Sequence, residues 1–527
     1  MKLRHWPVAV VAGLITSILV VPVSSAAPAA QSSGTAIAPG GTGAAAPRVA
    51  QARGAAGLVA PPAGRDHAPL GLNGRPATEG LPAAVPKVAK PAPSAIGKSA
   101  GAPNSVTAPR PLTPPGTTNA NFNGINQSAG GGAQPSDVNA ASGATQIVET
   151  VNRRFTVYNK TGTQQCTNTL AGFLGATEDV FDPRVQYDNV NDRFSMVVTL
   201  TPTSGTAAAA LYVAASQTGD ACGGWWVYRL TFNGSLYPAG TLLDYPQLGQ
   251  DRVALLLSSN NFHPSFINAA AFSISKAQVY AGASVSFPAF SVSPTTQPAT
   301  VGGNPMPATT NSYFLASVAG TGYRLYRMTN SAGPGTTLTL QATVSSTFAV
   351  PPRQVNQPGV TTKLDPSDGR IVWSPYQVGN FIWFTHGIAI GSFPGIRYGA
   401  IRLSDNAPFV ANAFRSGTSD DFNPSIGVSD ADGGGASNYI WLNWAYTDTT
   451  NNIATSVTVD GVLPGGGVPN LVGTGTVLVN GAATTTNTRF GDYSSVSVEN
   501  TCTAVVAQQY FATGGNWATR IGRLSFC

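Results

Sequence analysis

The stretch that decides the fold is DYPQLGQDRVALLLSSNNF, residues 244–262. It opens with an acidic residue and a proline, continues as a short strand to a polar turn, and returns as a second, apolar strand. Proline lacks a backbone N–H, so it is tolerated at the first residue of a strand but not in the middle. An acidic residue before it can hydrogen-bond nearby backbone and hold the turn. The opening therefore predicts a structural device at the start of a β-hairpin.

Near-copies of this hairpin recur along the chain. Clear copies are FDPRVQYDNVNDRFSMVVTL from Phe181, FNPSIGVSDADGGGASNYIWLNWAYTD from Phe422 and FGDYSSVSVENTCTAVVAQQYF from Phe490, and weaker copies begin at Met306 and Gln357. Anchors at Asp182, Asp244, Pro305, Gln357, Asn423 and Asp492 are 62, 61, 52, 66 and 69 residues apart. Repeats of this length, filled by strands without helical periodicity, predict the four-stranded blades of a β-propeller.

The number of openings and the chain ends predict how the ring closes. Six openings predict a six-bladed propeller, with seven blades as the alternative. After the last hairpin only NWATRIGRLSFC remains, which leaves that blade one strand short. Residues 145–159, TQIVETVNRRFTVYN, alternate as a strand should, and we expect them to complete the last blade. The fold class predicted is therefore all-β, with one propeller domain at residues 145–527 closed by an N-terminal strand.

The N-terminal quarter has a different composition. Residues 1–26 have a basic start, an apolar middle and small residues near Ala26, which predicts a secretory signal peptide, with an uncleaved anchor as the alternative. Residues 27–144 are rich in Ala, Pro and Gly, with Phe122 as their single aromatic residue. Such a segment buries too little apolar surface to offset its ordering entropy, so it predicts a disordered tether. No later segment is apolar enough to cross a membrane, and we expect a secreted or cell-surface protein.

The charge of the chain lies mainly on this tether. The whole chain carries +6, but residues 146–527 hold nineteen basic and twenty acidic residues, a net of −1. The predicted folded part therefore has no basic excess that would favour nucleic acid as a partner.

Cysteine usage indicates an oxidising compartment. The four residues Cys166, Cys222, Cys502 and Cys527 are an even number in a chain with an export signal, and no CxxC spacing supports a zinc site. Three pairings are open. We favour Cys166 with Cys222 and Cys502 with Cys527, which predicts two disulfides and no metal.

The chain resembles secreted bacterial β-propeller proteins of uncharacterised function, distantly related to the sialidase-like superfamily. The resemblance rests on FDPRVQYD, DYPQLGQDR, FNPSIGVS and RFGDYSSVSVEN with NWATRIGRL. A sialidase has three arginines that converge on a substrate carboxylate, and the resemblance offers Arg184, Arg252 and Arg489 for that role. The Asp-box repeat of sialidases has no faithful copy; DPSDGRIVW at 365–373 is the nearest stretch.

Polar residues that flank the openings are the candidates for a site at one mouth of the ring. The candidate mouth-binding residues are Asp182, Arg184, Asp244, Asp251, Arg252, Asn423, Arg489 and Asp492. Two carboxylates that face each other could hydrolyse a glycosidic bond, whereas the same residues could instead cap turns.

Few other catalytic patterns are present. Residues 146–527 contain no HExxH, GxSxG or Walker motif, and His386 lies in the apolar run FIWFTHGIAI, which is typical of a hydrogen-bonded core histidine. DADGGG at 430–435 leaves a weak calcium site open and no other cofactor is expected. We therefore expect a binding or scaffold module for a glycan or an extracellular protein, with no assigned catalytic residue. The alternative is a glycoside hydrolase or lyase that uses mouth carboxylates and arginines.

Overall fold

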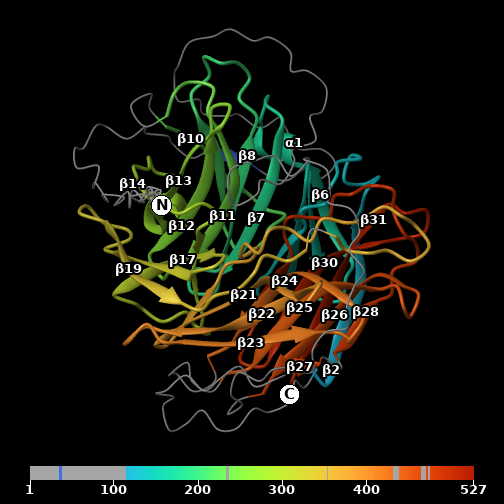
Figure 1. Ribbon diagram of the computed structural model, residues 1–527. Helices are drawn as coiled ribbons and strands as arrows, with labels where there is room; N and C mark the ends of the chain where they lie inside the picture. The colour runs from blue at the N-terminus through green and yellow to red at the C-terminus, as the bar shows by residue number, and fades with distance from the viewer. Residues whose placement is uncertain are drawn as a thin grey trace, which may run out of the picture.

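The protein is a β-propeller, as seen in a computed structural model (Figure 1). The structure describes residues 114–232, 237–352, 354–430, 438–463 and 475–527, and the backbone of residues 35–37 and 471–472. The predicted signal peptide and most of the predicted tether lie outside the described residues. Within these ranges the only helices are two short ones, α1 (Leu170–Leu174) and α2 (Lys276–Tyr280).

Seven four-stranded antiparallel meanders make up the described part of the chain. The first three are β3 (Asn139–Ser142), β4 (Gln146–Val151), β5 (Arg154–Asn159) and β6 (Gln164–Thr169); β7 (Val180–Asp188), β8 (Arg193–Leu200), β9 (Ala210–Ser216) and β10 (Trp225–Thr231); and β11 (Leu242–Gln250), β12 (Ala254–Phe262), β13 (Phe266–Ser275) and β14 (Ala289–Val292). The next two are β15 (Gln297–Pro298), β17 (Asn311–Val318), β18 (Gly322–Thr329) and β19 (Thr337–Ser345); and β20 (Tyr376–Val378), β21 (Phe381–Ile390), β22 (Phe393–Arg402) and β23 (Pro408–Phe414). The last two are β24 (Asp420–Val428), β25 (Ile440–Asp448), β26 (Ile453–Val462) and β28 (Thr476–Val479); and β29 (Ser495–Val498), β30 (Thr503–Phe511), β31 (Trp517–Ser525) and β2 (Thr117–Asn126).

Three very short strands add to these meanders. β16 (Thr300–Val301) pairs in parallel with both β11 and β20 and so joins two meanders into one hydrogen-bonded sheet. β27 (Leu471–Val472) pairs in parallel with β23, and β1 (Thr35–Ile37) pairs antiparallel with β10.

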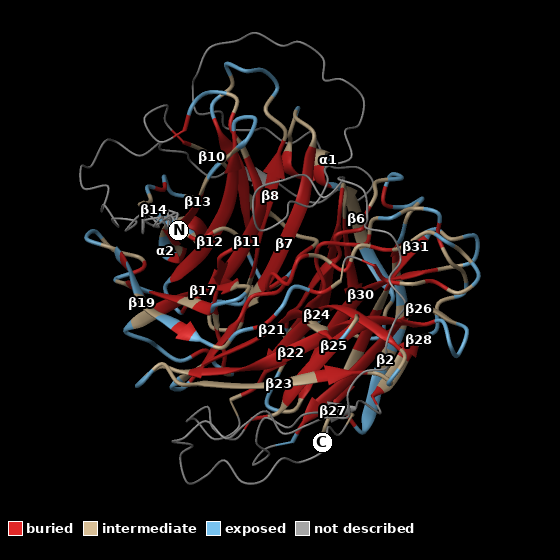
Figure 2. Ribbon diagram, viewed as in Figure 1, coloured by how far each residue is buried: buried red, intermediate tan, exposed pale blue. Residues whose placement is uncertain are grey.

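The core lies between meanders rather than within them. Each pair of neighbouring meanders encloses an apolar cluster, and an eighth, smaller cluster among the described residues lies around Phe348 and Ile388. Between the first two meanders, for example, the rings of Phe173 and Trp225 pack edge to face, with their centroids 5.2 Å apart. Figure 2 shows the resulting pattern, in which inner strands are buried and outer ones such as β19 and β2 are partly exposed. Large side chains fill the space between sheets that splay outward from an axis, as expected for tryptophans such as Trp441 and Trp444.

The expectation of six repeats was wrong because the first repeat, β3–β6, has only a weak copy of the opening. Its opening, SDVN at 136–139, has the acidic residue but no proline, and it follows an Ala/Gly-rich stretch. The weak anchors at Pro305 and Gln357 were also misplaced, since Pro305 follows the inner strand β15 and Gln357 lies well before the inner strand β20.

The closing strand was expected at the wrong place. Residues 145–159 do not complete the last blade, because β4 and β5 are the two middle strands of their own meander. Instead β2 pairs antiparallel with β31, from Thr117 opposite Ser525 to Asn126 opposite Ala518. An N-terminal strand thus closes the ring, and the predicted boundary at residue 144 is corrected. β2 is an outer edge strand that needs little apolar surface, so its polar sequence TTNANFNGIN resembled a tether.

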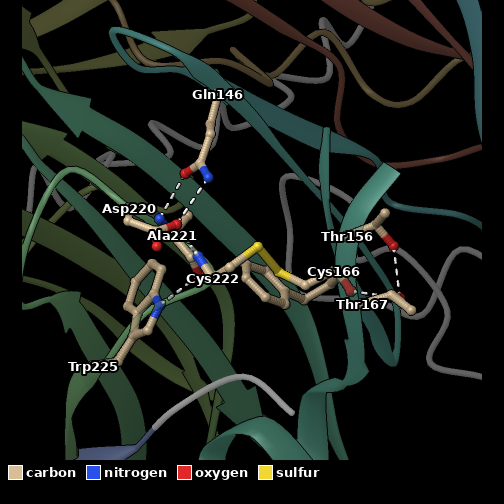
Figure 3. The surroundings of a disulfide bond; sticks show 9 residues. Gln146, Thr156, Cys166, Thr167, Asp220, Ala221, Cys222 and Trp225 are labelled. Atoms are coloured by element: carbon tan, nitrogen blue, oxygen red, sulfur yellow. Dashed lines mark hydrogen bonds between the residues drawn. A yellow bond between two sulfur atoms is a disulfide. The ribbon is translucent and has the colours of Figure 1, made fainter. Parts of the chain in front are cut away.

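Both predicted disulfides are confirmed. Cys166 of β6 is bonded to Cys222 in the loop before β10, which links two neighbouring meanders across a Cα–Cα distance of 6.0 Å (Figure 3). Gln146 reinforces the same junction, since its side chain donates to Asp220 Oδ1 at 2.8 Å and accepts from the Ala221 N–H at 2.7 Å. Cys502 is bonded to Cys527 within the last meander.

A fully buried carboxyl group holds the closing strand in place. Glu149 of β4 accepts hydrogen bonds from the Ile125 N–H of β2 at 3.0 Å, from the Tyr158 hydroxyl at 2.9 Å and from the Thr519 hydroxyl of β31. Burial raises the pKa of Glu149 to about 7. Three donors from three strands therefore depend on one side chain.

We expect Glu149→Ala to destabilise the ring, because it leaves the buried Ile125 N–H and Tyr158 hydroxyl without an acceptor, whereas the Thr519 hydroxyl keeps the Ile125 carbonyl at 2.9 Å. The loss should be about 3 kcal/mol or more in the free energy of unfolding, measured by urea denaturation. Thr117→Ala, on the exposed part of the same closing strand, is the control and should change stability by less than about 0.5 kcal/mol. Equal effects of the two substitutions would contradict this role of Glu149.

Candidate functional site at the two ends of the axis

The repeated opening builds a bulge at the start of an inner strand. Asp182, Tyr245 and Asn423 have φ values of 53°, 51° and 52°, and each is followed by a proline. In all three meanders the inner strand pairs with its neighbour on either side of the bulge, and the positive-φ residue and the proline after it have no partner in that pairing. Asp and Asn adopt positive φ more readily than most residues. Where the pairing is interrupted, a proline, which lacks a backbone N–H, removes no hydrogen bond between the strands. The motif thus sets the direction in which the side chains at the bulge point.

Four aspartates meet where the inner strands begin. Asp182, Asp244 and Asp492 were expected at a mouth of the ring, and Asp137, before β3, joins them. We call Asp137, Asp182, Asp244 and Asp492 the acid mouth; each is at most 8% exposed. The residues come from four consecutive meanders, and each carboxyl group lies close enough to others of the set to affect their pKa values.

Hydrogen bonds tie the acid mouth together. Asp137 accepts from the Asp492 N–H at 2.7 Å and from the Asn152 side chain. Asn152 also accepts from the Asp182 N–H at 2.8 Å, and the Tyr493 hydroxyl donates to Asp182 Oδ2 at 2.8 Å. The inner strands of three meanders are thereby linked through carboxyl and amide groups.

Burial favours the neutral form of these acids. It raises the pKa of Asp182 well above its ordinary value, and the charges of neighbouring aspartates raise it further. Burial also raises the pKa of Asp492 to about 8 and that of Asp244 to about 6, and raises that of Asp137. Nearby guanidinium groups of Arg370 and Arg489 oppose the shift for Asp492. At neutral pH the acid mouth therefore holds fewer charges than its four carboxyl groups suggest.

A stack of aromatic and guanidinium groups fills the axis next to the acid mouth. Arg184 lies between the rings of Trp373, at 5.0 Å, and Tyr493, at 4.4 Å. Tyr493 is 5.3 Å from Tyr245, whose ring in turn lies 4.7 Å from Arg370. We call these five residues the axial stack, and all are buried. Cation–π contacts of this kind hold a guanidinium group that has few hydrogen-bond partners.

The three arginines implied by the sialidase resemblance do not converge. Arg184 is in the axial stack and donates to the Val372 carbonyl at 3.2 Å. Arg489 lies at the acid mouth, 4.0 Å from Asp492. Arg252 is at the other end of the axis, where it donates to the Met306 carbonyl at 3.1 Å.

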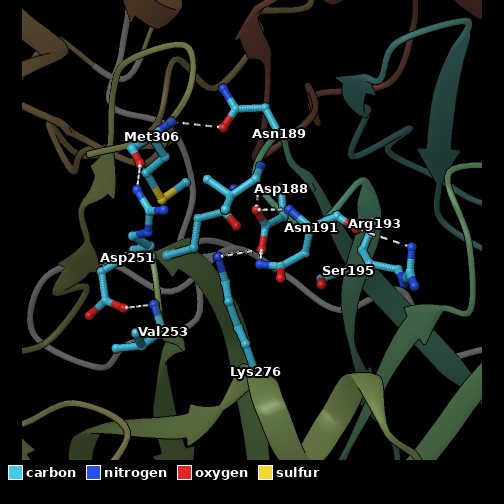
Figure 4. Close-up of polar contacts among 12 residues, drawn as sticks. Asp188, Asn189, Asn191, Arg193, Ser195, Asp251, Val253, Lys276 and Met306 are labelled. Carbon is cyan, nitrogen blue, oxygen red and sulfur yellow. Dashed lines mark hydrogen bonds and ion pairs between the residues drawn. The ribbon is translucent and has the colours of Figure 1, made fainter. Parts of the chain in front are cut away.

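Asp251 is also far from the acid mouth, because β11 separates it from Asp244. Six residues of extended chain span roughly 20 Å. Asp251 caps the hairpin turn, accepting from the N–H groups of Val253 and Ala254 (Figure 4). It also accepts from the hydroxyls of Ser312 and Ser331. Its role in the structure is that of a turn cap, as is common for buried aspartates.

Asn423 holds the inner strands together. Its side-chain amide donates to the Gly491 carbonyl at 2.7 Å and to the Tyr493 carbonyl at 3.3 Å. His386 is a core residue, fully buried, with its Nε2 3.0 Å from the Tyr323 hydroxyl; burial lowers its pKa to about 3.

Sequence reasoning missed Asp137, Tyr245, Tyr493 and Arg370. Asp137 and Tyr245 are positive-φ residues of openings, so the repeat pattern contained a signal for them. Arg370 lies in DPSDGRIVW and forms a bidentate pair with Asp368, with nitrogen–oxygen distances of 2.8 and 2.6 Å. No local pattern indicated that it would face the axis.

The opposite end of the axis is hollow. The inner strands end there in a small pocket that is partly open to solvent; the space that it encloses is about 60 Å³. Its polar and aromatic lining residues are Gln186, Tyr187, Asn189, Gln250, Thr300, Asn304, Trp373, Tyr376, Ser429, Asp430, Ser497, Asn500 and Thr501. We call it the axial pocket.

The axial pocket is almost free of charge. Among its described lining residues there is no Lys, Arg, His or Glu, and Asp430 is the lone carboxylate. Gln250 is 2% exposed; its Nε2 donates to the Tyr187 carbonyl at 2.8 Å, and its Oε1 has no hydrogen-bond partner in the described structure. Gln186 accepts from the Thr300 hydroxyl at 3.0 Å. Amide and hydroxyl groups beside aromatic rings suit an uncharged, hydroxyl-rich ligand.

Neither end carries a recognisable metal site. The described residues contain no group of three or more His, Cys, Asp or Glu side chains placed to hold a metal ion. Most of the weak calcium candidate, residues 431–435, lies outside the described residues. No helix in the described ranges has the length and hydropathy needed to span a membrane.

Comparisons with known proteins add little to this picture. No protein-family model matches the chain, and no curated protein matches it either. Among solved structures, an exo-beta-1,3-galactanase from Phanerochaete chrysosporium with galactose is 11% identical, covers 79% of this chain and 99% of its own, and has a TM-score of 0.30. A neuraminidase-like protein from A/bat/Guatemala/164/2009 is 11% identical over 69% and 99% of the two chains, with a TM-score of 0.33. The polysaccharide lyase Uly1 is 9% identical over 75% and 91%, with a TM-score of 0.31. Similarities this low carry no functional argument.

We expect the acid mouth to make stability depend on pH. The pKa values of Asp244 and Asp492 in the folded protein, about 6 and about 8, lie above their ordinary value of 3.8. Their contribution is therefore fully present below about pH 4 and is lost as pH rises through 6 and 8. The free energy of unfolding should fall between pH 4 and 8, and Asp244→Asn with Asp492→Asn should flatten this slope.

Urea denaturation across this pH range measures the effect. Asp405→Asn is the matched control, because the carboxyl group of Asp405 is exposed and its hydrogen bonds to Arg402 lower its pKa to about 2, outside the range. A double variant with the slope of the unmodified protein would contradict the assignment.

Proposed function

We propose that the protein is an exported β-propeller that binds a glycan at the cell exterior through the axial pocket. The observation that carries this proposal is the chemistry of the pocket, which combines amide and hydroxyl groups with the rings of Tyr187, Trp373 and Tyr376 and only one carboxylate. Sugar rings present hydroxyl groups at their edges and C–H groups on their faces, so they need both kinds of contact. The predicted signal peptide and the two disulfides support a secreted or cell-surface location.

Binding is favoured over hydrolysis because the pocket lacks a carboxylate pair. Hydrolysis of a glycosidic bond ordinarily needs an acid and a second carboxylate on either side of the bond. The four carboxyl groups that could act in pairs lie at the other end of the axis, where all four are buried and those of Asp137 and Asp182 are hydrogen-bonded within the protein.

A glycoside hydrolase or lyase at the acid mouth is the second candidate. It is supported by the raised pKa values of Asp182 and Asp492, since a catalytic acid must keep its proton near neutral pH. A screen of glycosides for turnover tests it. Any activity should then disappear in Asp182→Asn and in Asp492→Asn, and activity that survives both substitutions would exclude this site.

Binding is tested by titrating the full chain against a panel of neutral and charged glycans in solution. We expect neutral glycans to bind and Gln250→Ala to weaken binding about fivefold or more, the loss of one buried hydrogen bond. Gln247→Ala is the matched control, because Gln247 is an equally buried glutamine of the same strand that does not line the pocket. Binding to an extracellular protein with no response to any glycan would contradict the proposal.

A further inference from the structure

The axial pocket is closed at its inner end. Trp373 lines the pocket and also belongs to the axial stack, so the stack begins at the pocket floor. Behind Trp373, the spacings of 4.4 to 5.3 Å between successive members leave no room for another ring. The stack thus separates the pocket from the acid mouth.

The outer rim of the pocket is crossed by residues 302–306, which we call the rim segment. Gly303 accepts from the Asn189 side chain at 2.8 Å, and the Met306 N–H donates back to Asn189 Oδ1 at 3.0 Å (Figure 4). Asn304 donates to the Glu499 carbonyl at 3.0 Å. Asn189 and Glu499 belong to turns of two meanders that are not neighbours, because the meander β3–β6 lies between them. The rim segment therefore spans part of the mouth.

A floor and a spanned rim limit how a polymer can enter. A chain that lies across a protein needs a groove open at both sides, whereas a pocket with one opening admits only the end of a chain. The near absence of charge in the lining disfavours acidic sugars, whose carboxylates would find no cationic side chain among the described lining residues.

We propose that the axial pocket recognises the terminal residue of an uncharged glycan chain rather than an internal stretch. This inference rests on the proposed function and specifies its ligand. Because only the end residue enters, most of the binding free energy comes from one or two sugar units. Affinity for a given oligosaccharide series should then be nearly independent of chain length.

The test is isothermal titration of the full chain with neutral oligosaccharides of the gluco, galacto, manno and xylo series. Each series is supplied as dimer and hexamer, and as hexamer with a bulky acetal on the non-reducing end, a bulky aromatic tag on the reducing end, or both. We expect dimer and hexamer of the binding series to differ less than threefold in Kd. One of the two single caps, and the double cap, should weaken binding at least tenfold.

The outcomes separate this inference from the proposed function. Binding that tightens tenfold or more from dimer to hexamer, or that survives both caps, overturns end recognition while glycan binding stands. Binding to acidic but not neutral glycans overturns the neutral ligand class. Silence across every neutral series overturns the inference, and silence across the charged glycans of the binding panel as well overturns the proposed function.

Discussion

Seven inner strands converge on one axis, and the space available to their side chains there constrains the rest of the molecule. A regular strand would alternate its side chains, but the bulges at Asp182, Tyr245 and Asn423 interrupt that alternation at the same level in three meanders. Polar groups thereby meet one another instead of solvent. Because buried polar groups must find partners, the carboxyl, amide and hydroxyl groups at this level bond across meanders and fix their relative positions.

Closure of the ring depends on the meander β3–β6, which is held differently on its two sides. On one side the bond between Cys166 and Cys222 joins it covalently to the next meander. On the other side Glu149 binds the closing strand β2 and the strand β31 through three hydrogen bonds. An open ring would expose unpaired strand edges, and strong interactions on both sides of this meander stabilise the closed ring.

The two ends of the axis differ in chemistry because the axial stack separates them. At one end four carboxyl groups are crowded, and burial makes ionisation unfavourable. At the other end amides and hydroxyls line an open pocket with almost no charge. Arg184 and Arg370 lie with the rings between these ends, so the positive charges in the axis lie behind the pocket floor and do not line the pocket. A single fold thus presents two unlike environments within the length of one strand.

The sequence by itself determined the all-β propeller and indicated that Asp182, Asp244 and Asp492 share one mouth of the ring, because both follow from local patterns repeated at a regular spacing. Among three open disulfide pairings it favoured the one that the structure confirms. It could not determine that Asp251 and Arg252 lie at the opposite end of the axis. These residues follow the opening at Asp244 by only a few positions, but the extended strand β11 carries the chain from one end of the axis to the other. The sequence also hid the closing strand β2, because an outer edge strand has no need of the apolar residues that reveal other strands. The axial stack and the pocket were decided only by tertiary structure: their members come from separate meanders, and only closure of the ring brings those side chains together.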